Sequence, residues 1–189
     1  MDTGTERKTG GLIVYSSRTG NTRRLAEGIR QGLAEAGGPE GQELTLAAVE
    51  EAPDPAGAPW ILVGFWADRG NADQKALEYL TSLEGHRVGL FGTLGAYPES
   101  KHAEDIRQKV QALAAEKNTV LGCFLCQGKI DPALTERFKG LPADNPHAMT
   151  EERMKRHLEA AKHPDENDIR NAVRACLSMV QSSPPESSR

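Results

Sequence analysis

The stretch VYSSRTGNTRRLAEGI, residues 14–29, decides the fold because it joins an apolar strand to an amphipathic helix through a polar turn. Residues 11–16 (GLIVYS) form the short apolar run that is typical of a strand buried on both faces of a sheet. After the turn, Leu25, Ile29 and Leu33 recur at helical spacing on one face. A buried strand followed directly by a helix begins a βαβ unit, so the stretch predicts a parallel sheet.

The same alternation of strands and helices continues along the chain. Further strands are predicted over residues 43–49, 60–65, 87–93 and 119–127. Helices are predicted over residues 21–36, 72–83 and 165–180, with Asn71 as N-cap of the second, and another is predicted after the N-cap Ser100. This pattern predicts a three-layer α/β fold, with helices on both faces of a five-stranded parallel sheet. Five strands favour the doubly wound order 2-1-3-4-5.

The composition is that of a water-soluble protein, with 38% hydrophobic residues and a formal net charge of −4 over 189 residues. We expect one domain over residues 11–181, with disordered segments at residues 1–10 and 182–189. The negative charge argues against nucleic-acid binding, and the apolar runs are far shorter than the roughly 20 residues of a membrane span. Because the three cysteines lack framework spacing and no secretory signal is visible, we expect a cytoplasmic protein.

A long insert, residues 128–164, separates the fifth strand from the last helix. It is polar and is predicted to hold short helices near residues 132–139 and 150–162, the second capped by Thr150. Because the insert leaves the fifth strand at its carboxyl end, it begins at the edge where such sheets bind ligands.

The polar turn after the first strand predicts a phosphate site. A helix N-terminus carries partial positive charge, and Ser17, Thr19, Asn21 and Thr22 add side-chain donors. Gly20 allows the backbone to approach a ligand closely. The turn contains neither a triphosphatase loop nor a dinucleotide fingerprint, and it has no cysteine nucleophile. The pattern therefore favours a phosphate-bearing cofactor that is held and not cleaved.

The motif SRTGNT, residues 17–22, resembles the S/T-x-T-G-x-T phosphate loop of flavodoxins, which bind flavin mononucleotide (FMN). The alternative is an ordinary helix cap rich in serine and threonine. Arg18 departs from the small residue that is common in this loop, and it either pairs with the phosphate or points to solvent. The resemblance implies a flavodoxin-like fold with FMN as cofactor.

Two later loops agree with this resemblance. The loop of residues 64–73 corresponds to the flavodoxin loop that packs on the isoalloxazine ring, with Trp66 as the stacking residue or, alternatively, a core residue. Tyr97 is the stacking candidate on the other face, unless it is a plain turn residue, and Trp60 is expected to plug the core. The resemblance implies cofactor contacts from Ser17, Arg18, Thr19, Gly20, Asn21, Thr22, Phe65, Trp66, Ala67, Asp68, Gly70, Thr93, Leu94, Gly95, Ala96 and Tyr97.

A narrower resemblance covers most of the chain. The segments GFWADRGNAD, GLFGTLGAYPESKHA, FLCQGKID and PADNPHAMTEERMKR are similar to small flavodoxin-like proteins found beside bacterial bilirubin reductases. The resemblance implies a bacterial electron carrier without catalytic residues, which assists a redox partner such as a bilirubin reductase. One alternative is a stand-alone FMN-dependent NAD(P)H oxidoreductase acting on a small substrate, with His147 or Tyr97 as proton donor. Another is a flavin-free scaffold that binds partners through the insert.

The cysteines and histidines are the remaining candidates for redox or metal-binding groups. Cys123 and Cys126 match C-x-x-C, but residues three apart in a strand point to opposite faces, so burial is expected for them and for Cys176. The five histidines share no ligand spacing with cysteines or carboxylates, so no metal site is predicted.

Charges near the predicted ring are mixed, since Asp68 and Asp73 share their loop with Arg69. We therefore predict a flavin potential that is less negative than in strongly acidic flavodoxins. Lys129 of the insert could reach the same edge. A group of four further insert residues either lines a substrate or docking surface near the flavin or belongs to a solvated helix face: His147, Met149, Arg153 and Arg156.

Overall fold

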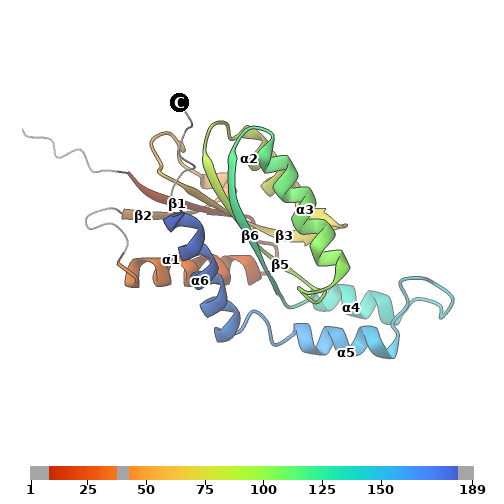
Figure 1. Ribbon diagram of the computed structural model, residues 1–189. Coiled ribbons are helices and arrows are strands. Elements are labelled where there is room, and N and C mark those ends of the chain that lie inside the picture. Colours follow the sequence, from red (N-terminus) through yellow and green to blue (C-terminus); the bar gives the residue numbers. More distant parts are fainter. Residues whose placement is uncertain (1–8, 38–42, 183–189) are drawn as a thin grey trace, which may run out of the picture.

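The computed structural model describes residues 9–37 and 43–182. Five parallel strands form the central sheet in the order β2-β1-β3-β5-β6 (Figure 1). Numbered among themselves along the chain, these strands have the order 2-1-3-4-5, so the predicted fold is confirmed. Their bounds are β1 (Thr9–Tyr15), β2 (Glu43–Ala48), β3 (Ile61–Asp68), β5 (Arg87–Leu94) and β6 (Thr119–Gln127).

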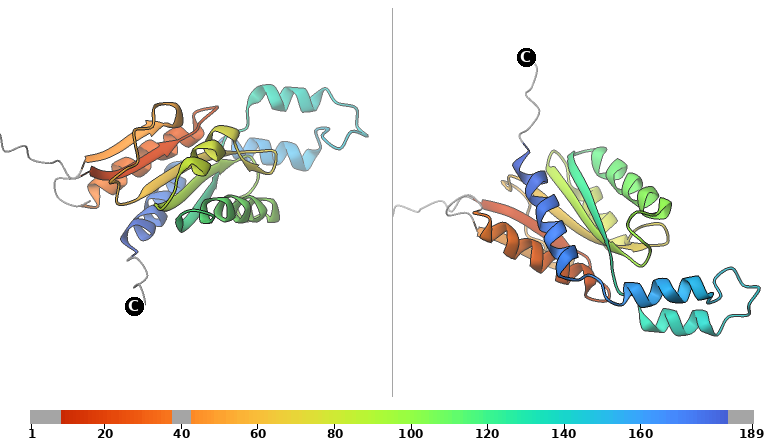
Figure 2. Two further views of the ribbon diagram at one scale, coloured as in Figure 1. Left: turned by 90° about the horizontal axis from the view of Figure 1, so that it is seen from above. Right: turned by 60° about the horizontal axis from the view of Figure 1, so that its bottom comes forward.

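The helices cover both faces of this sheet, as Figure 2 shows. Strand residues alternate between two cores: Val14 faces the core beneath one pair of helices and Ile13 faces the other. The first core is shared with α2 (Gln74–Ser82) and α3 (Lys101–Ala115), and the second with α1 (Asn21–Glu35) and α6 (Glu166–Gln181). A short 3-10 helix, η1 (Val49–Glu51), follows β2.

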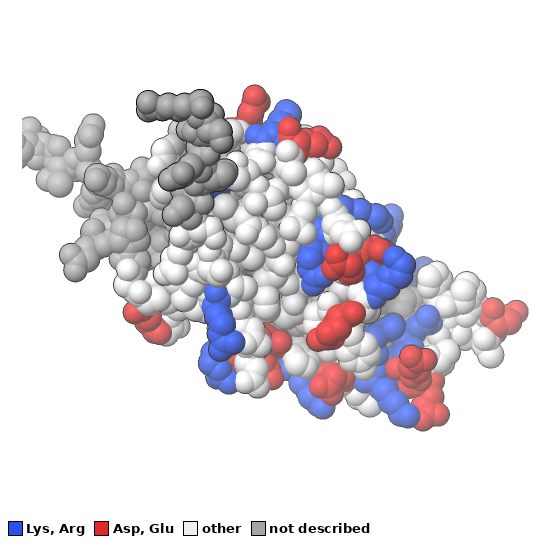
Figure 3. Space-filling model, viewed as in Figure 1, with Lys and Arg blue, Asp and Glu red and all other residues white. Residues whose placement is uncertain are grey.

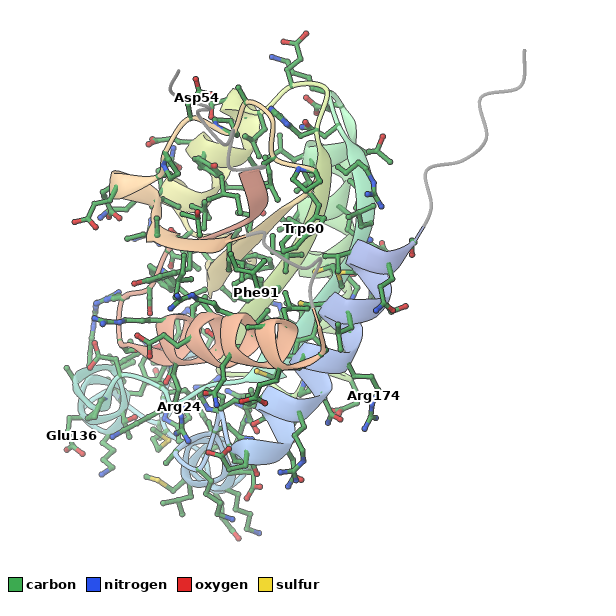
Figure 4. All side chains as sticks on the ribbon, turned by 90° about the vertical axis from the view of Figure 1, so that its left-hand side faces the viewer. Arg24, Asp54, Trp60, Phe91, Glu136 and Arg174 are labelled. Atoms are coloured by element: carbon green, nitrogen blue, oxygen red, sulfur yellow. The ribbon has the colours of Figure 1, made fainter. Side chains whose placement is uncertain are left out.

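Trp60 lies in the second core, as expected. It is 7% exposed, and Figure 4 shows it with Phe91 in the layer between the sheet and α1. A Cβ atom added at Gly11 would lie only 1.9 Å from the Trp60 ring, so glycine at that position makes room for the indole.

A small hairpin at the end of β3 was not predicted. β4 (Asn71–Ala72) pairs antiparallel with the end of β3. Arg69 and Gly70 connect the two strands with φ values of 48° and 79°, the positive values that a tight two-residue hairpin turn requires. Two residues are too few for an alternating pattern to be recognised in a sequence.

The hairpin moves the start of α2. The predicted N-cap Asn71 is wrong, because this residue pairs with β3 and is therefore extended. The actual cap is Asp73, whose side chain accepts a hydrogen bond from the backbone N–H of Ala76.

The insert folds into two helices, α4 (Pro132–Lys139) and α5 (Glu151–Ala160), which lie side by side and project from the sheet (Figures 1 and 2). Both helices were predicted, and the predicted cap Thr150 accepts a hydrogen bond of 3.1 Å from the N–H of Arg153. Ser100 likewise caps α3, accepting from the N–H of Ala103. We call α4, α5 and their connection the hairpin insert.

Of the terminal segments that were expected to be disordered, residues 1–8 and 183–189 lie outside the described residues, and β1 already begins at Thr9. No helix in the described part of the chain is long and apolar enough to cross a membrane.

The cysteines are free thiols that belong to the protein core. Cys126 lies in the core of α1 and α6, and Cys123 packs against the opposite core, as the strand geometry predicts. Burial raises the pKa of the Cys123 and Cys176 thiols to about 12, and it raises the pKa of Cys126 further still. Thiols with such pKa values stay protonated, which argues against thiolate chemistry.

Candidate functional site

A cavity of about 430 Å³ opens at the carboxyl edge of the sheet. Its volume lies in the range of roughly 300–1,000 Å³ that is typical of small-molecule sites. Its lining comes from the turns after β1, β5 and β6, from the ends of strands β3 and β5, and from α1, α3, α4 and α5. Ten of the predicted site residues line it: Arg18, Thr19, Asn21, Trp66, Ala67, Thr93, Leu94, Gly95, Ala96 and Tyr97.

The other six predicted site residues do not line this cavity: Ser17, Gly20, Thr22, Phe65, Asp68 and Gly70. The Phe65 side chain is fully buried in the core, and Gly70 belongs to the β3–β4 turn. Thr22 is buried as well, with its hydroxyl 2.9 Å from that of Thr93 and 3.3 Å from the carbonyl oxygen of Phe65. Its side chain therefore connects the start of α1 to strands β3 and β5.

The N-terminus of α1 differs from every other α-helix start in the described residues. Its N-cap is Gly20, which has no side chain to donate or accept, and no acidic residue occurs in its first turn. The other five α-helices begin with a side-chain oxygen that accepts a backbone N–H, from Asp73, Ser100, Asp131, Thr150 and Asp165.

This uncapped helix end is suited to bind an anion. Ser17 Oγ accepts from the N–H of Arg23, but within residues 9–37 and 43–182 the N–H groups of Asn21 and Thr22 have no acceptor. Gly20 has φ 89°, and an added Cβ would meet nothing within 4 Å, so the space in front of the turn is open. Free N–H groups and the helix dipole together favour a phosphate at this point.

Trp66 and Arg18 lie together in the cavity. The Arg18 guanidinium carbon is 5.6 Å from the centroid of the Trp66 ring, and Arg18 Nη2 is 3.7 Å from Asp131 Oδ2. Arg18 thus covers one face of the indole and contacts the insert. Its side chain is 63% exposed, so moving it aside for a planar ligand costs little.

Asp73 is an anchor that the sequence analysis did not assign. Its buried carboxylate accepts hydrogen bonds from Ser16 Oγ at 2.6 Å and from the N–H of Trp66 at 3.2 Å, in addition to that of Ala76. Asp73 therefore connects the turn after β1, strand β3 and the start of α2. An aspartate directly before a helical pattern indicates an N-cap, but the sequence analysis placed the cap at Asn71.

Asn21 connects the phosphate turn to the insert. Its Nδ2 donates to the carbonyl oxygen of Lys129 at 2.8 Å and to Thr19 Oγ1 at 3.1 Å. Gly128 donates to the carbonyl oxygen of Leu94 at 2.9 Å, so the segment after β6 is also held against the loop after β5. Lys129 lines the cavity, which confirms that it reaches this edge.

The hairpin insert supplies a wall of the cavity through Ile130, Asp131, Leu134, Phe138, Arg156 and His157. His157 is 7% exposed, and its Nδ1 lies 2.8 Å from Thr135 Oγ1. Burial, assisted by the charges of Arg156 and Arg153, lowers the pKa of His157 below its usual value. His157 is therefore a neutral group at the cavity at pH 7.

His147, the alternative proton donor suggested by the sequence, does not line this cavity. It stacks on Phe138 with ring centroids 6.1 Å apart and borders a separate hollow of about 280 Å³. His157 was not predicted as a site residue. It is buried because α4 packs against α5, and helical periodicity does not predict that packing.

One cluster of metal-ligand types occurs in the described residues, formed by His163, Asp165 and Asp168, with ligand atoms within 4.8 Å of one another. It is explained by helix capping. Asp165 and Asp168 form a capping box at the start of α6, and His163 Nδ1 lies 2.5 Å from Asp168 Oδ2. The cluster does not line the cavity.

The sheet order, the uncapped helix start and the two aromatic side chains at one edge define a doubly wound α/β protein that binds a phosphate-bearing planar cofactor. The chain belongs to the flavodoxin family: the family model described as Flavodoxin domain matches residues 12–176. Flavodoxins bind FMN, and the donors at α1 together with Trp66 and Tyr97 fit its phosphate and its ring.

Individual relatives agree with this assignment. The chain is 32% identical over 177 residues to the flavodoxin-like domain-containing protein BilS of Clostridioides difficile (strain CD3), covering 89% of this chain and 95% of the relative. It is 32% identical over 170 residues to the protein of the same name from Clostridium symbiosum (strain WAL-14163), covering 83% and 88%. The crystal structure of oxidised Flavodoxin 1 from Bacillus cereus has a TM-score of 0.56 at 14% identity, covering 93% of this chain and 100% of that one. This last likeness shows the fold alone.

Proposed function

We propose that this chain is an FMN-binding electron carrier that delivers electrons to a reductase. The observation that carries the proposal is the uncapped N-terminus of α1, whose first residue, Asn21, lines the same cavity as Trp66 and Tyr97. A carrier needs a cofactor that is held firmly, and it needs no acid–base side chain.

Each part of the cavity has a role in this proposal. Bound FMN supplies the capacity to accept and release electrons. The N–H groups of Asn21 and Thr22 bind the phosphate, and the rings of Trp66 and Tyr97 flank the cofactor's planar part. Tyr97 and Leu134 are 44% and 38% exposed, so they form an apolar mouth at which a partner can approach.

A bilirubin reductase is the partner that we propose. The support is the resemblance of four long segments to small flavodoxin-like proteins found beside bacterial bilirubin reductases, together with the 32% identity to two flavodoxin-like relatives. As part of the same proposal, the protein is bacterial and works in the cytoplasm.

The first test is purification followed by an absorption spectrum and cofactor release. We expect a flavin band, and after removal of the cofactor the protein should bind FMN far more tightly than riboflavin, which lacks the phosphate. The chemically reduced protein should then be reoxidised by a bilirubin reductase in the presence of bilirubin. A colourless protein that gains no flavin band on reconstitution would rule out the carrier.

A second candidate is a stand-alone FMN-dependent NAD(P)H oxidoreductase. It is favoured by one observation: the insert places the buried His157 in the wall of the same cavity as Trp66. Stopped-flow mixing with NADPH or NADH separates the two candidates. Rapid bleaching of the flavin without any partner supports the oxidoreductase, whereas slow or absent bleaching supports the carrier.

A further inference from the structure

Arg156 of α5 is a cation at the cavity without a partner. Its Nε is buried and has no hydrogen-bond acceptor, and no carboxylate within the described ranges 9–37 and 43–182 forms an ion pair with its guanidinium. Burying such a donor without an acceptor is costly, because its interaction with water is lost and nothing replaces it. A side chain in this condition at a cavity wall points to a ligand with an acceptor.

The other charges at the cavity do not share this condition. Arg18 pairs with Asp131 at 3.7 Å, and Asp131 also caps α4. Lys129 is exposed, so water solvates its ammonium group. The charged lining therefore has three cations and one carboxylate, although the whole chain carries a net charge of −4. The excess positive charge is concentrated where a ligand would bind.

The phosphate of FMN already has a separate site. The free N–H groups at the start of α1 are suited to bind it, while Arg156 belongs to the hairpin insert on a different element. The guanidinium of Arg156 is thus available for a second anionic group. A planar guanidinium matches a carboxylate especially well, because two N–H groups can donate in parallel.

The surface beside Arg156 is apolar. Phe138 and Leu134 line the same cavity from α4, and Leu134 is one of three large apolar side chains that are exposed in the described residues. The Phe138 ring is held in place by the Arg153 guanidinium, 5.7 Å from its centroid, and by the tilted ring of His157 at 6.2 Å. An aromatic side chain that is held in place, next to an Nε–H without an acceptor, fits an organic molecule with a carboxylate and an apolar body.

We propose that the hairpin insert makes this cavity a two-ligand site, in which Arg156 binds the carboxylate of a small organic acid lying beside FMN. The apolar body of that acid packs on Phe138 and Leu134. The proposal rests on the proposed function for the FMN, but the Arg156 subsite is formed by the insert alone.

The test uses benzoate as the probe and benzamide as its uncharged counterpart. The buried Nε–H of Arg156 gives a side-chain signal in ¹H–¹⁵N NMR spectra, which Arg156→Gln identifies by its loss. Benzoate, but not benzamide, should shift this signal in the FMN-loaded protein. Arg156→Gln should weaken benzoate binding by roughly tenfold or more, since hydrogen bonds to charged groups are worth about 1.5–3 kcal/mol. Arg156→Lys should restore part of the affinity.

The matched control is Lys155→Gln, which removes the same charge from the neighbouring residue of α5. Lys155 is exposed and pairs with Glu151 at 2.8 Å, so benzoate affinity should not change. The proposal is wrong if benzoate leaves the Arg156 signal unmoved, or if Arg156→Gln weakens FMN binding while riboflavin binding is unaffected, because Arg156 would then serve the phosphate. If the protein binds no FMN, the proposed function fails, and benzoate titration of the cofactor-free protein still decides on the subsite.

Discussion

The starts of α1, beside the cavity, and of α5, in the hairpin insert, are built in opposite ways. At α5, Thr150 accepts the N–H of Arg153, and Glu151 and Glu152 follow in the first turn, so the helix satisfies its own dipole. At α1 there is a glycine in the cap position and no acid in the first turn. The difference shows that one helix start serves stability, whereas the other leaves its donors for a ligand.

The largest expected effect comes from giving α1 the kind of cap that α5 has. Gly20→Asp places a carboxylate beside the phosphate site, and aspartate tolerates positive φ better than most residues. We expect FMN affinity to fall by roughly 100-fold or more, because like charges held together cost several kcal/mol. Fluorescence titration with FMN measures the affinity.

Gly20→Asn is the matched control for this substitution, because it adds nearly the same volume without the charge. Its FMN affinity should lie well above that of Gly20→Asp, and riboflavin should hardly distinguish the two. Equal FMN affinities for both variants would mean that shape, and not charge, governs the site.

Asp73, the buried N-cap of α2, extends the comparison, because its side chain also accepts hydrogen bonds from outside the helix. In Asp73→Ala, the hydroxyl of Ser16 and the N–H groups of Trp66 and Ala76 lose their acceptor. We expect the free energy of unfolding to fall by about 3 kcal/mol, since each unsatisfied buried donor costs roughly 1–3 kcal/mol. Urea denaturation measures it, and Asp73→Asn, which keeps one acceptor oxygen, should lose less.

Removing the cap of α5 should have a smaller effect, and only on stability. Thr150→Ala deprives the N–H of Arg153 of its acceptor. We expect a loss of about 1 kcal/mol in the free energy of unfolding and no change in FMN affinity. A clear loss of FMN affinity in this variant would break the distinction between the two helix starts.

The smallest effects concern pH, where two histidines of the region should act in opposite directions. The pKa of His157 is lower in the folded protein because of burial, so its contribution to stability is present above about pH 6.5 and is lost as the pH falls through the folded pKa. The pKa of His163 is higher in the folded protein, chiefly because of its hydrogen bond with Asp168. Its contribution is present below about pH 6.5 and is lost as the pH rises through the folded pKa. Urea denaturation from pH 5 to pH 8 should therefore give profiles that His157→Gln and His163→Gln change in opposite senses.

Much of this architecture could be predicted from the sequence, because the apolar runs and helical repeats are long. The strand of residues 119–127 and the helix of residues 132–139 were predicted with their observed bounds, as were the caps Ser100 and Thr150. The β3–β4 hairpin was missed because two residues carry no period, and Asp73 was missed with it.

The site itself was predictable only where it is local in sequence. The turn of residues 17–22 and Tyr97 follow strand ends, and Trp66 lies near the end of β3, so topology alone brings them to one edge. Arg156 was expected either at this edge or on a solvated surface, whereas His157 was not assigned. Both are more than 25 residues past β6, and they reach the cavity only because α5 packs back on α4. That contact depends on side-chain packing, which a single sequence does not display.

Whether the potential of bound flavin is less negative than in acidic flavodoxins stays a prediction. Figure 3 shows acidic and basic side chains interspersed over α3 and the insert, without a large area of one sign on that face. The carboxylate of Asp73 is buried next to Trp66, where it accepts three hydrogen bonds from uncharged donors. Redox titration of the reconstituted protein measures the potential.

The Arg18 guanidinium lies over the indole of Trp66, which has a consequence for solubility. An aromatic surface that is exposed to water promotes aggregation. A charged side chain lying on the indole reduces the apolar surface that is open to water, and so it should reduce aggregation of the cofactor-free protein. We therefore expect Arg18→Ala to precipitate more readily than the natural chain when flavin is scarce, and excess FMN to remove that difference.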